Sequence, residues 1–234
     1  MSVATFVVAH GAWSSAWAWK KMRPLMRAAG HEFWTPTYTG LGERSHLASP
    51  DVDLNTHIRD VINVLEFEDL KDIVLVGHSY GGMVATGIAD GARERIRQVI
   101  YLDAFVPENG KCLTDYLAQA SRDARQTGDD GWRIPPMGMP PDTADADREW
   151  ATPRRMPHPA KCFSTPIKLS GKALPPRHYI YCTRAAPDDR FGQFAQRARK
   201  EGWGYSEIDA SHNPHITAPD ELMKLLHGIA RQKA

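Results

Sequence analysis

The feature that most constrains the fold is a hexapeptide, Gly77-His-Ser-Tyr-Gly-Gly82, which stands where an apolar run gives way to a helical pattern. Residues 73–76 form a short apolar segment typical of a strand buried on both faces of a parallel sheet. Residues 83–92 show a helical pattern. Small residues two before and two after Ser79 leave room for a sharp turn that projects the serine beyond its neighbours. The hexapeptide therefore predicts a strand, a tight turn with an exposed hydroxyl, and a helix.

The rest of the chain repeats the alternation of strands and helices. Further strands are expected at residues 5–9, 99–102 and 179–182, with weaker candidates at 32–35 and 205–208. Further helices are expected at residues 19–29, 54–65, 191–200 and 220–231. This alternation implies right-handed crossovers, so we predict an α/β fold with a mostly parallel sheet and helices on both faces.

The alternation stops between residues 107 and 176, a stretch that holds 11 of the 17 prolines. Proline removes backbone donors, so this segment cannot continue the sheet. We predict a cap inserted after the strand that ends near Asp103, with residues 1–106 and 177–234 as the core. A disordered excursion is the alternative, but the segment is rich in large apolar side chains, which favours a cap. These are Trp132, Met137, Met139, Trp150 and Phe163.

Charge and cysteine content narrow the classes of function. The 29 basic and 28 acidic residues leave a formal net charge of +1, so neither nucleic acid nor an anionic membrane is expected as a partner. No apolar run approaches the ~20 residues of a membrane span, and the first residues lack a basic signal region, which predicts a cytoplasmic protein. Cys112, Cys162 and Cys182 are expected to be free thiols, with no zinc site.

A second loop is expected beside the serine, at His10-Gly-Ala-Trp13 after the first strand. A serine that attacks a carbonyl needs two backbone N–H donors to hold the developing oxyanion. The N–H of Ala12 is one candidate, and the N–H of Tyr80, at the start of the helix that follows Ser79, is the other. The alternative is an ordinary turn in which His10 and Trp13 only pack.

His212 is the best candidate for the general base among ten histidines. It follows the last expected strand and precedes a helix, which places it at the carboxyl edge of the sheet beside Ser79. The rival His215 lies three residues further on, and Pro214 disfavours a helical pair of metal-binding histidines there. His78 adjoins the serine, but the turn points it away from the hydroxyl.

The acid that would orient His212 stays open between two places. Asp103 directly follows the strand at 99–102, whereas Asp188 and Asp189 lie in the loop after the strand at 179–182. Both places keep the chain order Ser, Asp, His. Paired aspartates before a helix often serve only as its cap, so we favour Asp103 and keep Asp188 as the alternative.

Four segments give the chain its resemblance to a known family. They are residues 6–13, Gly40-Leu-Gly42, residues 77–82 and Ser211-His-Asn-Pro214. Here the chain resembles small α/β-hydrolases related to plant methyl esterases, such as the salicylic-acid-binding esterase, and to plant hydroxynitrile lyases. Residues 101–107 resemble a segment of bacterial esterases. The resemblance implies a six-stranded parallel core, a short helical cap and no cofactor. It also implies an acid near Asp188 in the plant branch, and at Asp103 in some bacterial relatives.

Two positions separate the hydrolases of this family from its hydroxynitrile lyases. The lyases carry a lysine after the base and a threonine in the first oxyanion loop, whereas this chain has Asn213 and Gly11. Without that ammonium, departing cyanide would be poorly stabilised. We therefore predict a serine hydrolase that cleaves a small carboxylic ester through an acyl-enzyme. A hydroxynitrile lyase and a non-catalytic ligand receptor are the alternatives, and a homodimer is left open as the assembly.

Overall fold

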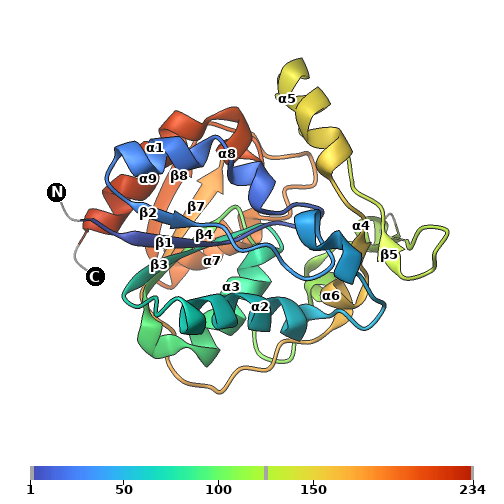
Figure 1. The fold of residues 1–234 in the computed structure, drawn as a ribbon, viewed down its shortest axis with the longest axis horizontal. Coiled ribbons are helices and arrows are strands. Elements are labelled where there is room, and N and C mark those ends of the chain that lie inside the picture. The colour runs from blue at the N-terminus through green and yellow to red at the C-terminus, as the bar shows by residue number, and fades with distance from the viewer. Residues whose placement is uncertain (1–2, 124–125, 233–234) are drawn as a thin grey trace.

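The computed structural model describes residues 3–123 and 126–232, built around one six-stranded sheet. The strand order is β2-β1-β3-β4-β7-β8, and every neighbouring pair is parallel (Figure 1). The strands are β1 (Thr5–Ala9), β2 (Glu32–Trp34), β3 (Ile73–His78), β4 (Ile96–Leu102), β7 (Arg177–Cys182) and β8 (Gly204–Ile208). The predicted parallel α/β sheet is confirmed, including the two weaker strands at its edges.

Helices cover both faces of this sheet, as Figure 1 shows. One face carries α1 (Met22–Ala28), α8 (Pro214–Thr217) and α9 (Pro219–Arg231). The other carries α2 (Leu54–Phe67), α3 (Gly81–Gly91) and α7 (Gly192–Lys200). The helix expected at 19–29 begins only at Met22, because Pro24 fits no later than the first turn of a helix. A 3-10 turn, η1 (Ala16–Trp19), precedes it.

The strands divide their side chains between two cores. Val7 and Leu75 enter the core beneath α2 and α3, whereas Phe6 and Val74 enter the core beneath α1 and α9. Successive strand residues point to opposite faces, so a strand with helices on both sides must be apolar at every position. This explains the unbroken apolar runs in the sequence. Because all strand pairs are parallel, the carboxyl ends of the strands lie at one edge of the sheet.

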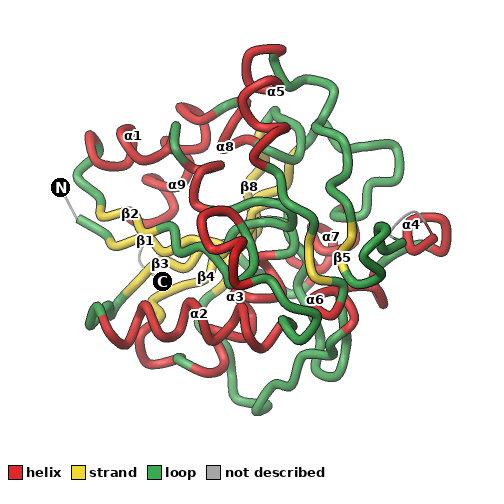
Figure 2. The backbone as a smooth tube through the Cα atoms, turned by 45° about the vertical axis from the view of Figure 1, so that its right-hand side comes forward, coloured by secondary structure: helices red, strands yellow, loops and turns green. Residues whose placement is uncertain are grey.

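The segment at 107–176, here called the inserted segment, lies between β4 and β7 and beside the carboxyl ends of the strands (Figures 1 and 2). It holds α4 (Gln119–Asp123), α5 (Asp145–Ala151), α6 (Lys161–Ser164) and a two-stranded antiparallel sheet of β5 (Arg133–Ile134) and β6 (His158–Pro159). Phe163 and Ile134 are buried in the core beneath α2 and α3. That the inserted segment forms a separate cap stays a prediction.

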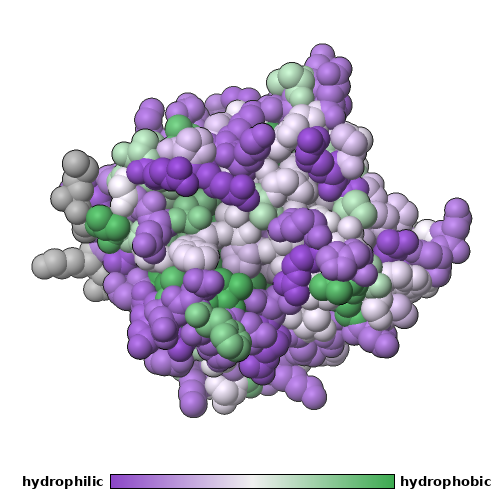
Figure 3. Space-filling model, in the orientation of Figure 1, coloured by the Kyte–Doolittle hydropathy of each residue, from purple (hydrophilic) through white to green (hydrophobic). Residues whose placement is uncertain are grey.

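The remaining 3-10 turns are η2 (Gly42–Leu47), η3 (Arg93–Arg95), η4 (Leu113–Tyr116) and η5 (Thr152–Arg154). None of the described helices is both long and apolar enough to cross a membrane. The face of the molecule drawn in Figure 3 is mostly hydrophilic, with scattered apolar residues. Cys112, Cys162 and Cys182 are all buried free thiols, as the sequence predicts.

Candidate active site

Ser79 stands at the turn between β3 and α3 with a backbone φ of 56°. This left-handed conformation is rare for a residue with a side chain, and it is held by close packing of the backbone on both sides. A Cβ at Gly81 would lie 2.0 Å from the backbone oxygen of Ala9, and one at Gly77 would lie 2.8 Å from the Cβ of Ala85. Only glycine fits at these two positions, which explains the spacing of the motif.

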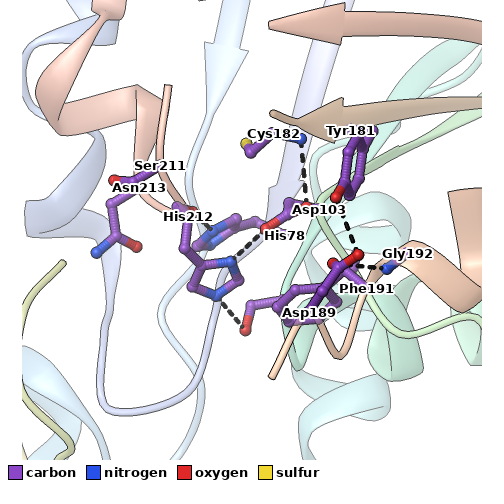
Figure 4. A network of polar contacts seen from close by, with 12 residues as sticks. His78, Asp103, Tyr181, Cys182, Asp189, Phe191, Gly192, Ser211, His212 and Asn213 are labelled. Carbon is purple, nitrogen blue, oxygen red and sulfur yellow. Dashed lines mark hydrogen bonds and ion pairs between the residues drawn. The ribbon is translucent and has the colours of Figure 1, made fainter. Parts of the chain in front are cut away.

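His212 lies on the loop between β8 and α8, and its Nε2 is 2.9 Å from Ser79 Oγ. The imidazole stacks on Phe191 with ring centroids 4.7 Å apart (Figure 4). His78 faces away from the serine hydroxyl, and its Nε2 is 2.7 Å from the backbone oxygen of His212. The predicted pair of Ser79 and His212 is therefore brought within hydrogen-bond distance, and His78 supports the loop that carries the histidine.

Asp103 directly follows β4, and its Oδ2 is 2.7 Å from His212 Nδ1 (Figure 4). Its other carboxylate oxygen accepts a hydrogen bond of 3.3 Å from the Cys182 backbone N–H. The side chain is buried, and the backbone φ of 43° is again left-handed. The strained turn aims the carboxylate along the sheet edge toward the base.

The alternative acids are occupied elsewhere. Asp188 forms an ion pair with Arg190. Asp189 accepts hydrogen bonds from the Tyr181 hydroxyl at 3.1 Å and from the Gly192 N–H at 3.0 Å, which caps the start of α7 (Figure 4). The geometry brings Asp103 to His212, and it gives the aspartates of the later loop a structural role.

Burial is the main electrostatic influence on this pair of residues. It lowers the pKa of His212 to about 3, which keeps the imidazole neutral and able to accept a proton. It raises the pKa of Asp103 to about 7, although the Cys182 N–H acts in the opposite direction. Both shifts disfavour the charged form of the side chain concerned.

Ala12, in the loop after β1, lines the cavity above Ser79, and Tyr80 lines the same cavity. Among the described residues, neither the Ala12 N–H nor the Tyr80 N–H donates a hydrogen bond. Free donors at a helix start and at a neighbouring loop are what a developing oxyanion requires. The arrangement fits the two donors expected from the sequence.

The inserted segment fastens this loop at Trp13, whose φ is 58°. The Trp13 backbone N–H donates to His158 Nδ1 at 3.3 Å, and the indole N–H donates to the Ile134 oxygen at 2.9 Å. The Met156 N–H donates to the Trp13 oxygen at 3.3 Å. Three hydrogen bonds thus tie the inserted segment to the residue next to Ala12. Sequence reasoning missed His158, because it lies in a segment without a periodic pattern.

A cavity of about 530 Å³ opens above the serine. Its size is that of a pocket for a small organic molecule. Its walls come from the first loop, the turn at Ser79, residues 137–142 of the inserted segment and the loops at 184–191 and 211–216. Phe105, Leu113 and Phe163 contribute apolar surface. The cavity therefore suits a compact, partly apolar ligand whose reacting group sits at Ser79.

One group of possible metal ligands lies near this site. The side chains of His57, His158 and Cys162 offer ligand atoms within 4.8 Å of one another. Both nitrogens of His57 already have partners, the Tyr80 hydroxyl and the Thr39 oxygen. The Trp13 N–H that donates to His158 Nδ1 places the ring proton on Nε2, and burial raises the pKa of the Cys162 thiol. These residues fit a packed polar cluster better than a metal centre.

Comparisons with known proteins show which proteins this chain is similar to. The model of the alpha/beta hydrolase family matches residues 6–225. A carbendazim hydrolyzing esterase from Nocardioides sp. (strain SG-4G) is 38% identical over 97% of this chain and 100% of that protein. The pFDCC methylesterase MES16 from Arabidopsis thaliana is 26% identical over 94% of this chain and 92% of that protein.

Among solved structures, an extracellular alpha/beta-hydrolase from a Paenibacillus species superposes with a TM-score of 0.84 at 24% identity. The match covers 98% of this chain and 100% of that one. A polyneuridine aldehyde esterase mutant superposes with a TM-score of 0.80 at 21% identity, over 97% of this chain and 99% of the other. These structures share the fold, and the expected resemblance to methyl esterases is confirmed by the sequence relatives.

Proposed function

The chain belongs to the alpha/beta hydrolase family and is a carboxylic ester hydrolase, and we propose that it works through a covalent acyl-enzyme formed on Ser79. The observation that carries this proposal is the 2.9 Å distance between Ser79 Oγ and His212 Nε2. A serine hydroxyl at its ordinary pKa is a weak nucleophile, so it needs an adjacent base to take its proton.

In the first half of the reaction, neutral His212 accepts the proton of Ser79 as the oxygen attacks the ester carbonyl. The oxyanion of the tetrahedral intermediate accepts hydrogen bonds from the N–H groups of Ala12 and Tyr80. The imidazolium then donates its proton to the leaving alcohol oxygen as the carbon–oxygen bond breaks. The alcohol departs, and the acyl group remains on Ser79.

In the second half, a water molecule takes the place of the alcohol. His212 accepts a proton from this water as its oxygen attacks the acyl carbonyl, and the same two N–H groups hold the second oxyanion. The imidazolium returns the proton to Ser79 Oγ, and the acid leaves. Asp103 holds the imidazole through Nδ1 and stabilises its positive charge during both halves.

The cavity supports a small ester with an apolar or aromatic part as the substrate. Phe105, Leu113 and Phe163 offer surface for such a group, and a volume of about 530 Å³ limits its size. Because the Nocardioides relative is named for carbendazim hydrolysis and the plant relatives for methylesterase activity, we propose carbendazim and aryl methyl esters as the first substrates to test.

Gly11 argues against the hydroxynitrile lyase alternative. A Cβ at this position would lie 2.9 Å from His78 Nδ1 and 3.2 Å from the Cβ of Ser79. The first oxyanion loop therefore has no room for the threonine that the lyases carry there. Asn213, which follows the base, also lacks the positive charge that would stabilise cyanide.

The proposal is tested with a panel of p-nitrophenyl acetate, aryl methyl esters and carbendazim. We expect turnover of at least one member, and a loss on the order of 10⁶ in kcat for Ser79→Ala. Ser14→Ala is the matched control, because Ser14 lines the same cavity outside the proposed triad. Equal turnover by Ser79→Ala and the wild type would overturn the mechanism, and cyanide release from mandelonitrile without ester cleavage would favour the lyase.

A further inference from the structure

Arg155 of the inserted segment lines the cavity without a carboxylate partner. Its guanidinium Nη1 lies 2.8 Å from the Met139 sulfur, and its Cζ lies 5.8 Å from the centre of the Trp13 ring. Within residues 3–123 and 126–232, Arg155 forms no ion pair. A thioether is a weak acceptor, so most of the hydrogen-bonding capacity of this guanidinium is unused.

The other two arginines of the cavity differ in this respect. Arg184 donates to both oxygens of Asp209, at 2.8 and 2.9 Å, and Arg190 pairs with Asp188. Burial lowers the pKa of Arg155, and no neighbouring carboxylate opposes that effect. Arg155 is half-buried at the cavity wall, so its unpaired N–H groups are accessible to a ligand that supplies the counter-charge or acceptor.

The position of Arg155 links it to the reacting centre. It lines the same cavity as Ser79 and His212. Burial is the main cause that lowers the pKa of His212, but the charges of Arg190 and Arg155 contribute, so the guanidinium is within electrostatic reach of the base. A small molecule with its carbonyl at Ser79 can therefore meet Arg155 with another of its groups.

We propose that Arg155 makes this hydrolase selective for esters whose non-reacting part carries a planar hydrogen-bond acceptor, such as a carboxylate or a ketone oxygen. The guanidinium presents N–H donors in a flat fork that matches planar acceptors. The guanidinium contacts Met139 and lies over the Trp13 ring, and these contacts limit the entropy lost on binding. The inference rests on the proposed esterase function and names the substrate class of the same site.

The test compares methyl benzoate with its meta and para derivatives that carry a carboxylate or an acetyl group. The measured quantity is the ratio of kcat/KM for the best acceptor-bearing ester to kcat/KM for methyl benzoate. We expect Arg155→Met to lower this ratio about tenfold or more, because a hydrogen bond to a charged group is lost. The ratio is the measured quantity because Arg155 also acts on His212, and an effect through the base changes kcat/KM for both esters alike and cancels in the ratio.

Arg184→Met is the matched control, since it removes a cation from the same cavity wall and should leave the ratio unchanged. If Arg155→Met does not fold, Arg155→Lys replaces it; Lys keeps the charge without the fork, so the ratio should still fall. A ratio equal to that of the wild type in the folded variant would overturn the role of Arg155. Absence of turnover for every ester in the wild type would instead count against the proposed function.

Discussion

Asp103 and His212 are 109 residues apart in the chain, and their side chains meet at 2.7 Å. The contact joins the residue that follows β4 to the loop that follows β8, across the carboxyl end of β7. The proposed acid thus follows β4, the strand that pairs with β3, and Ser79 follows β3 directly. The aspartates after β7 are left to pair with Arg190 and to cap α7.

Substitution of Asp103 and of Asp188 in turn tests which of the two positions supplies the acid. Asp103→Asn should lower kcat on the order of 10⁴-fold, because the amide favours the wrong tautomer of His212. Asp188→Asn is the matched control and should keep kcat within a few fold, because Asp188 pairs with Arg190 instead of the base. Steady-state kinetics with p-nitrophenyl acetate measure both. The reverse ranking of the two variants would move the acid to the later loop.

The pH profile should report the shared proton of Asp103 and His212. With Asp103 ionised and His212 neutral, the active pair carries one negative charge, and the first proton that binds neutralises it. Burial favours the uptake of this proton, so we expect the acid limb of the kcat/KM profile near pH 7. In Asp103→Asn the lone imidazole would become charged, which burial opposes, so the limb should move toward lower pH. A limb that stays in place, or that moves to higher pH, would contradict this coupling.

Five buried histidines and the half-buried His212 should make the fold sensitive to acid. Burial is the main cause that lowers the pKa of each: His10, His57, His78, His158, His212 and His215. Below the unfolded pKa of 6.5 the unfolded chain binds more protons than the folded one, so the free energy of unfolding falls as pH falls from 6.5 toward 3.

Asp103 acts in the opposite sense, because its raised pKa favours the folded state as pH falls from about 7 toward 3.8. Asp103 binds one proton more in the folded state, whereas the six histidines together bind up to six fewer, so the histidines determine the sign of the change in the free energy of unfolding. Urea unfolding between pH 8 and pH 4 measures the balance. A free energy of unfolding that stayed constant from pH 7.5 to pH 5 would show that these imidazoles are not held neutral.

The hydrogen bond from Trp13 to His158 should matter for the rate more than for binding. His158→Phe keeps the ring stacked on Phe163, where the centroids are 4.7 Å apart, but removes the acceptor of the Trp13 N–H. The neighbouring Ala12 N–H then loses its fixed direction, and we expect kcat to fall about tenfold with KM changed less than about twofold. The measurement is steady-state kinetics on one ester.

His178→Phe provides the control for that variant, since His178 is a buried histidine of β7 bonded to Ser206 and does not line the cavity. It should leave kcat unchanged. If His158→Phe lowered kcat/KM through a change in KM and left kcat unchanged, the inserted segment would only shape the pocket and would not hold the oxyanion loop.

Much of the fold could be predicted from local sequence signals. The apolar runs of the inner strands β1, β3, β4 and β7 follow from burial on both faces of the sheet. The glycines around Ser79 follow from backbone crowding at the turn. Both features can be recognised from neighbouring residues in the sequence. His212 could be singled out because it follows the last strand and precedes a helix that opens with Pro219, although in the structure the short α8, which opens with Pro214, comes before that helix.

The acid and the inserted segment were harder for a physical reason. Two strands end near aspartates, and only the strand order β3-β4-β7 and the side-chain directions distinguish them. The contacts of His158 with Trp13, 145 residues away, and of Arg155 with Met139 depend on irregular chain without a period. Such long-range pairings leave no local pattern in the sequence.

The central claim is that Ser79 carries the acyl group during turnover. Its most direct test is mass spectrometry of the protein after reaction with p-nitrophenyl acetate and rapid acid quenching, followed by peptide mapping. We predict an added acetyl mass on the peptide that contains Ser79, and none in Ser79→Ala. An acetyl group on another residue, or turnover by Ser79→Ala at the wild-type rate, would contradict the account.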